Sequence, residues 1–264
     1  MLKKFSLVFF STIAVLSLHS APVGNTMAPQ LIQQGFLIPC DSWIDFRAGY
    51  EGDFVGDGRL KQIVEGSGRV DTFQQYSNAA TITLNIVDRL DIYGVFGSSR
   101  VCSDWRFNTA TTITRIQLET LYHFFWGAGA RGIFFEWDKL CLGLGGRYSY
   151  CSYKPSWLTT NAIPVSVAGT RLIWREWQID LDVSYNIDMF TPYLGVKYSN
   201  VLAKLGTFPT PISSGGTGND QFQNRTPVGI FIGCAISNCK YFMLNIEGRL
   251  VDEDAVTISG DLRF

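Results

Sequence analysis

The feature that most constrains the fold is a strict alternation of apolar and polar residues along segments of about ten residues. Between Ile173 and Tyr185, one set of alternate positions is mostly apolar, and the other set carries Glu176, Asp180 and Asp182. Side chains along a β-strand point alternately to opposite faces. The alternation therefore predicts strands that have one apolar face and one charged face.

Ten segments of this kind follow one another along the chain. Their lengths are close to the roughly 9–11 residues that a tilted β-strand needs to cross a bilayer. No segment beyond the N-terminus has the roughly 18 consecutive apolar residues of a transmembrane helix. The expected strands are 43–54, 74–86, 90–97, 122–136, 139–152, 172–186, 190–201, 226–236, 240–251 and 255–264.

The connections between these strands alternate between short and long. The short ones are 87–89, 137–138, 187–189 and 237–238, and the long ones are 55–73, 98–121, 153–171 and 202–225. One exception, 252–254, is a short turn on the side of the long connections. Bacterial outer-membrane barrels have short periplasmic turns and longer external loops. The pattern predicts an all-β fold, a transmembrane antiparallel up-and-down β-barrel of about ten strands. A count of twelve strands is also compatible with it.

A soluble two-sheet sandwich would show the same alternation. Bulky aromatic residues near the strand ends favour the membrane barrel, because aromatic girdles mark both bilayer interfaces. Trp126, Trp177, Tyr185 and Phe264 are examples. Arg175 interrupts an apolar face near one end of its strand, from where its long side chain can reach the headgroups.

The N-terminus has the pattern of a secretory leader. A short basic start precedes an apolar run from Phe5 to Leu18, which is too short for a spanning helix. We expect cleavage after Ser20, so that residues 1–20 form a signal peptide. Residues 21–42 are then a periplasmic N-terminal segment, and residues 43–264 form the barrel.

Charge and residue content argue against several other functions. The formal net charge is −1, which gives no electrostatic reason to expect a nucleic acid partner. His123 is the one histidine beyond the leader, and no catalytic constellation or metal-ligand pattern surrounds it. The Gly-x-Gly-x-x-Gly pattern at 127–132 lies inside an expected strand, where dinucleotide binding does not occur. We expect no catalytic residue, no metal and no cofactor.

Several motifs in order along the chain resemble one family. They are Ala21–Asn25 followed by Pro29, Arg47–Val55, Leu84–Asp91, Gly127–Gly132 with Leu142–Tyr150, Arg175–Gln178, Met189–Ser199 and the closing strand to Phe264. This set is similar to the chlamydial major outer membrane protein porins. The chain is shorter between strands than those proteins and lacks their Cys-Gly-Cys turn.

The resemblance implies a protein of the bacterial outer membrane that lets small hydrophilic solutes or ions diffuse through it. Alternation directs a set of charged residues inward as pore-lining candidates: Asp45, Arg47, Glu51, Arg131, Arg147, Asp180, Lys197, Glu247 and Arg249. A barrel of about ten strands has a narrow interior, which paired charges can fill. The alternative function is therefore a closed barrel with a structural role in the envelope.

Six cysteines are expected to reach an oxidising compartment: Cys40, Cys102, Cys141, Cys151, Cys234 and Cys239. Six cysteines allow 15 intramolecular pairings. The resemblance implies that at least some join neighbouring envelope proteins or copies of this chain. The expected partners are thus outer-membrane lipid, small hydrophilic solutes, and disulfide-linked envelope proteins or a homo-oligomer.

Overall fold

The structure is a computed structural model. It describes residues 22–38, 42–63, 68–108, 113–206, 221–238 and 240–264. The expected signal peptide lies outside the described residues, as do Cys40 and Cys239.

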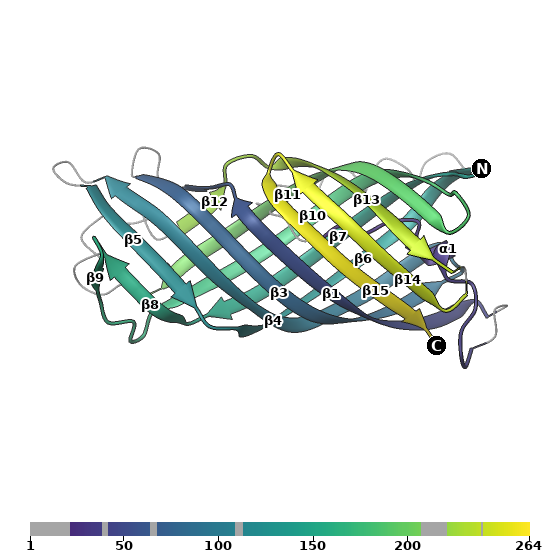
Figure 1. Cartoon of the computed structure of the whole chain (residues 1–264), viewed down its shortest axis with the longest axis horizontal. Coiled ribbons are helices and arrows are strands. Elements are labelled where there is room, and N and C mark those ends of the chain that lie inside the picture. Colours follow the sequence, from purple (N-terminus) through teal and green to yellow (C-terminus); the bar gives the residue numbers. More distant parts are fainter. Residues whose placement is uncertain (1–21, 39–41, 64–67, 109–112, 207–220, 239) are drawn as a thin grey trace, which may run out of the picture.

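Ten antiparallel strands form a closed barrel (Figure 1). Around the barrel their order is β3, β1, β15, β14, β13, β11, β10, β7, β6 and β4, and pairing between β3 and β4 closes the ring. This confirms the predicted fold class and the ten expected strands. They are β1 (Ile44–Gly58), β3 (Gly68–Ile86), β4 (Leu90–Asn108), β6 (His123–Trp137), β7 (Leu140–Tyr153), β10 (Arg171–Tyr185), β11 (Phe190–Gly206), β13 (Val228–Ser237), β14 (Phe242–Leu250) and β15 (Glu253–Arg263).

Four of the short connections, those after β3, β6, β10 and β13, lie at one end of the barrel together with the C-terminus, and the short turn between β14 and β15 lies at the other end (Figure 1). The turn between β3 and β4 shows why they are tight. Val87 and Asp88 both have positive φ, at 56° and 51°, which suits a two-residue hairpin turn between twisted strands. Asn85 accepts a hydrogen bond from the Asp88 N–H through its side chain. We call this end the periplasmic end, as the loop-length pattern predicts.

The other end carries extra strands within the stretches that were expected to be long loops. These are β2 (Leu60–Gln62), β5 (Ile113–Thr120), β8 (Pro155–Thr160), β9 (Ile163–Pro164) and β12 (Gln221–Asn224). Strand β5 pairs with β4 and β8, and β12 pairs with β11 and β2. The barrel wall therefore extends beyond the predicted strand ends, and β4 continues to Asn108 where the sequence pattern placed a loop from residue 98.

This outer extension has an apolar interior. Phe73 stacks on Trp174 with ring centroids 4.8 Å apart, and Trp105 meets Phe222 edge to face at 5.4 Å. Val101, Ile116, Leu118, Leu158 and Leu205 are buried in the same cluster. The barrel interior is thus apolar at the outer end, whereas nearer the periplasmic end it is mainly polar.

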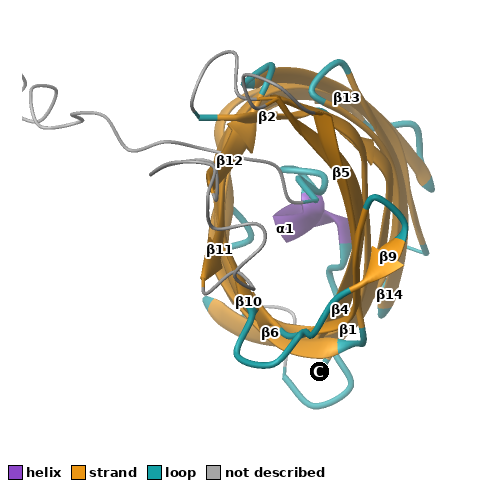
Figure 2. Ribbon diagram, turned by 90° about the vertical axis from the view of Figure 1, so that its left-hand side faces the viewer, coloured by secondary structure: helices purple, strands orange, loops and turns teal. Residues whose placement is uncertain are grey.

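The segment Pro22–Ile32 lies inside the barrel near the periplasmic end. It includes the short helix α1 (Ala28–Leu31), which Figure 2 shows within the ring of strands. Val23, Thr26 and Ile32 are each no more than 3% exposed. The sequence pattern assigned residues 21–42 to the periplasm. In the structure, residues 22–32 of this segment instead lie inside the barrel and fill space that the wall encloses.

The outer face of the wall is apolar along the barrel strands. Exposed residues include Ile82, Leu144, Leu181, Val196, Ile232 and Ile258, which all point away from the interior. A contiguous apolar surface of this kind suits contact with lipid. Among the described residues, no helix has the length and hydropathy needed to cross a membrane.

Candidate functional site: the barrel lumen

The structure directs all nine pore-lining candidates to the inner face of the wall. Eight of them are buried, and Arg131 is half-buried. Every second residue of each strand points inward, and the residues between them point outward. The charged residues occupy inward positions, and the apolar residues occupy outward positions. The inner face of the periplasmic half is therefore a surface of paired charges and hydrogen-bonding groups.

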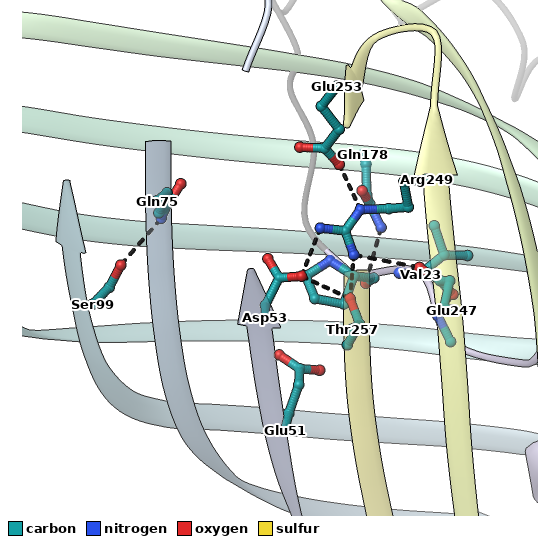
Figure 3. Close-up of polar contacts among 12 residues, drawn as sticks. Val23, Glu51, Asp53, Gln75, Ser99, Gln178, Glu247, Arg249, Glu253 and Thr257 are labelled. Carbon is teal, nitrogen blue, oxygen red and sulfur yellow. Dashed lines mark hydrogen bonds and ion pairs between the residues drawn. The ribbon is translucent and has the colours of Figure 1, made fainter. Parts of the chain in front are cut away.

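Arg249 stands at the centre of the largest charged network (Figure 3). Its Nη2 lies 2.6 Å from the Asp53 Oδ1, and its Nε donates to Glu253. Glu253 also accepts from the Lys197 Nζ at 2.6 Å. Asp252 binds the same ammonium at 3.1 Å. The Arg249 Nη1 also lies 3.5 Å from the Glu247 Oε1. One guanidinium and one ammonium thus face four carboxylates in a buried region.

Arg147 and Glu51 form a separate pair. The two guanidinium nitrogens donate to the two carboxylate oxygens at 2.9 and 2.8 Å. This bidentate geometry is the strongest form of the Arg–carboxylate contact. Because β7 and β1 are not neighbours in the wall, the pair spans the lumen.

A third network lies near the periplasmic end. Asp91 binds Arg131 at 3.0 Å and lies 3.6 Å from Arg47. Asp45 lies between Arg47 and Arg263, at 3.4 and 3.0 Å. Asp180 contrasts with these groups, because it forms no ion pair with a described residue, and its Oδ1 has no hydrogen-bond partner among them.

Four carboxylates of these networks lie outside the set of nine candidates: Asp53, Asp91, Asp252 and Glu253. Asp53 shares the inward parity of Glu51 in β1. Asp91 had a readable signal, since it shares the inward parity of Tyr93 and Val95 in β4. Asp252 and Glu253 had none, because the run of acids at 252–254 is typical of an exposed turn. In the structure their side chains turn inward to Lys197.

The N-terminal segment is bound to the wall through its backbone amides. Glu247 accepts hydrogen bonds from the N–H groups of Val23 and Gly24 at 3.1 and 2.9 Å. Asp182 accepts from the Thr26 N–H at 3.3 Å and also from the Thr26 hydroxyl. Two inward carboxylates therefore have a stretch of this chain as their partner.

The carbonyl groups of the segment are bound by donors from other strands. Arg47 donates to the carbonyls of Ala28 and Pro29 at 2.8 and 2.7 Å. The Ser237 hydroxyl donates to Leu31, and Arg263 donates to Ile32. Gln178 holds the start of the segment through the Pro22 carbonyl at 3.1 Å. Strands β1, β10, β13, β14 and β15 thus all contact it.

Little free space remains beside the segment. Two cavities that adjoin Pro22 have volumes of about 30 and 20 Å³, enough for about one water molecule each. A cavity of about 830 Å³ opens at the outer mouth and is lined by charged residues that include Arg59, Lys61, Arg69, Asp71 and Arg225.

Four of the six cysteines are described, and all four carry free thiols. Cys141 and Cys151 are buried on the inner face of β7. Cys102 and Cys234 lie on the outer face and are partly exposed. No disulfide joins these four residues, and the predicted cysteine partners therefore stay a proposal.

His123 forms hydrogen bonds with backbone groups, and its ring meets the Tyr153 ring edge to face with centroids 6.2 Å apart. Its Nδ1 lies 2.8 Å from the Leu121 carbonyl, and its Nε2 accepts from the Lys154 N–H at 3.1 Å. Among the described residues, no group of His, Cys, Asp and Glu side chains has an arrangement that could hold a metal ion.

A closed barrel with a lipid-facing apolar wall, a charged inner face and short turns at one end is a porin-like β-barrel of a bacterial outer membrane. The sequence comparisons identify the relatives. The family described as Chlamydia major outer membrane protein matches residues 158–207. The major outer membrane porin, serovar H, of Chlamydia trachomatis is 27% identical in an alignment 399 positions long, which spans 100% of this chain and 99% of that protein.

The major outer membrane porin of Chlamydia muridarum is 25% identical and is aligned over 94% of this chain and 96% of its own length. The resemblance predicted from the motifs is thereby confirmed. Among solved structures, the COG4313 outer membrane channel from Pseudomonas putida F1 covers 86% of this chain and 100% of its own, with a TM-score of 0.41 and 11% identity. The outer membrane protein OprG from Pseudomonas aeruginosa covers 88% and 99%, with a TM-score of 0.39 and 10% identity.

Proposed function

We propose that this barrel lets small hydrophilic solutes or ions diffuse through its lumen, and that passage requires the segment Pro22–Ile32 to move away from the wall. The observation that carries the proposal is the inner face of the periplasmic half. Most of its inward side chains are charged or form hydrogen bonds, as water-lined pores require and as an apolar core does not. The relatives named porins support the same function.

The chemistry of the segment's contacts supports its movement. Glu247 accepts hydrogen bonds from backbone N–H groups of the segment, and Arg47 donates to its backbone carbonyls. The apolar side chains of the segment pack on a small wall cluster of Ile133, Cys141, Ala235 and Met243. Water can replace the hydrogen bonds, and the net free energy of each is therefore only about 0.5–3 kcal/mol. Departure of the segment would leave Glu247 and Asp182 solvated rather than stranded.

Conductance in planar bilayers tests this function. The protein without its predicted leader is compared with a variant that also lacks residues 22–32, and both are checked for folding by heat-dependent migration in SDS. We expect the deletion to raise the open probability or the unit conductance. Silent recordings from both folded proteins would overturn the proposal.

The filled interior favours a second candidate, a closed barrel with a structural role in the envelope. The charged networks and the segment fill the periplasmic half, and the apolar cluster around Trp105 and Phe222 fills the outer extension. Free thiols on the outer face, at Cys102 and Cys234, are available for links between molecules. Non-reducing gels of freshly isolated envelopes should then show species that collapse to monomer with reductant, whereas fully monomeric migration would contradict the cross-linked coat.

A further inference from the structure

The outer wall of β10 and β11, together with the residue that directly follows β7, carries a group of four cations that the lumen does not use. Lys154, Arg171, Arg175 and Lys204 are all exposed, and all point away from the barrel interior. None makes an ion pair with a described residue. We call these four residues the basic patch.

Strand register brings the patch together. Arg175 pairs with Tyr150 of β7 and Leu202 of β11, and Lys204 pairs with Ile173 two positions further out. Arg171 lies beside Lys154 in the same register, because Leu172 pairs with Tyr153. Adjacent strands are about 4.8 Å apart, so the four side chains can converge on one group.

The outward residues of these three strands around the patch are not acidic, and the exposed Glu119 lies on the separate strand β5, where Thr120 pairs with Pro155. In the outer parts of β7, β10 and β11, these positions hold Ser152, Ile173, Asn200 and Leu202. On the other side of the barrel, the outward positions of β14, β15 and β1 contain no Lys or Arg. Among the described residues, the outward positions of β7, β10 and β11 thus hold no acidic side chain that could neutralise the four cations.

The height of the patch places it at a membrane interface. Arg175 is ten residues from Tyr185 at the periplasmic end of β10. For a strand tilted by about 45° with a rise of about 3.4 Å per residue, this distance is about 24 Å of height. The apolar band of outer-membrane barrels is about 25 Å tall. An aromatic cluster lies at the same level, where Trp126 contacts Tyr148 and Tyr150 with ring centroids 5.8 and 6.2 Å apart.

We infer that the basic patch binds the phosphate groups of an outer-leaflet glycolipid headgroup. Arginine binds phosphate oxygens in a bidentate manner, and lysine adds a compact charge. The aromatic cluster beside Arg175 gives the acyl chains and sugars of the same lipid a flat surface. The site is independent of the lumen, and it does not depend on whether the barrel conducts.

Titration of the purified barrel in zwitterionic detergent with bisphosphorylated lipid A, read by native mass spectrometry, tests the inference. The test variant replaces Lys154, Arg171, Arg175 and Lys204 by Gln. The control variant replaces four cations of the outer-mouth cavity, Arg59, Lys61, Arg69 and Arg225, by Gln, so that both variants lose the same charge. We expect lipid A binding to weaken by about tenfold or more in the test variant and by less than about twofold in the control.

Two further ligands identify what the patch recognises. Dephosphorylated lipid A should bind to the unmodified barrel no more tightly than lipid A binds to the test variant. Equal weakening in the two variants, or no weakening in either, would overturn the site. Phosphatidylglycerol that binds as tightly as lipid A would show recognition of any anionic lipid and would overturn the glycolipid assignment. Heat-dependent migration in SDS must be preserved in both variants before binding is compared.

Discussion

At the scale of single residues, the buried pair of Arg147 and Glu51 is where charge and stability are most directly linked. Both side chains are at most 10% exposed, and Glu51 has no other hydrogen-bond donor among the described side chains. Removal of one partner leaves a buried charge beside a cavity with room for only about one water molecule. A buried pair broken in this way typically costs about 3–5 kcal/mol.

We therefore predict that Arg147→Met lowers the free energy of unfolding by about 3–5 kcal/mol, and that adding Glu51→Leu restores most of the loss. Urea unfolding in lipid vesicles, followed by tryptophan fluorescence, measures both. The matched control is Arg89→Gln, which breaks the exposed pair with Glu136 at the periplasmic end and should cost no more than about 1 kcal/mol. A single Arg147 variant as stable as the control would show that the pair is solvated.

The sequence predicted which way these side chains point but not which partners they meet. Alternation is local, and it is sufficient to direct Arg147 inward. Its partner lies 96 residues away on a strand that is not adjacent in the wall. Contacts across a lumen depend on strand order, tilt and barrel width, which no local pattern contains.

At the scale of elements, the outer extension shows where a length criterion failed. Trp105 and Phe107 alternate with Asp104 and Arg106 in the same way as the membrane segments do. A strand of bilayer-crossing length ends at residue 97, and the sequence pattern therefore predicts a loop from residue 98. The strands continue because the wall beyond the bilayer buries a second, apolar interior.

Ion pairs on the outside of this extension make its stability depend on pH in the acid range. Arg106 donates two hydrogen bonds to Asp71, which lowers the pKa of that carboxyl below its ordinary value of 3.8. A carboxyl with a depressed folded pKa stabilises the fold above its unfolded pKa, and this stabilisation disappears as pH falls through the folded pKa. The contribution is therefore complete at neutral pH and is lost below about pH 3.8.

We predict that acidification below this value increases hydrogen exchange in the outer parts of β3 and β4, after correction for intrinsic rates. The Asp71→Asn variant should show the higher exchange already at neutral pH and a smaller further change in acid. An identical acid response in the variant would mean that another group controls this region.

At the scale of the whole molecule, the main departure from the sequence-based expectation is the position of residues 22–32. The segment has neither strand nor helix periodicity, so nothing local directs it into the barrel. Its site consists of Glu247, Asp182, Arg47 and Arg263, which come from four different strands and converge only when the barrel has closed. The lumen is thus a binding site for a peptide that belongs to the same chain.

A binding site of this kind should accept the same peptide when it is no longer covalently attached. We predict that a synthetic peptide with the sequence of residues 22–33 reduces the conductance of the barrel that lacks residues 22–32, in a saturable manner. It should act from the periplasmic end, where α1 lies (Figure 1). A peptide with Thr26→Ala loses the hydroxyl contact to Asp182 and should bind several-fold more weakly, by about 1 kcal/mol. Equal block by a scrambled peptide, or equal block from both sides, would show that the effect is nonspecific and that the segment has no defined site.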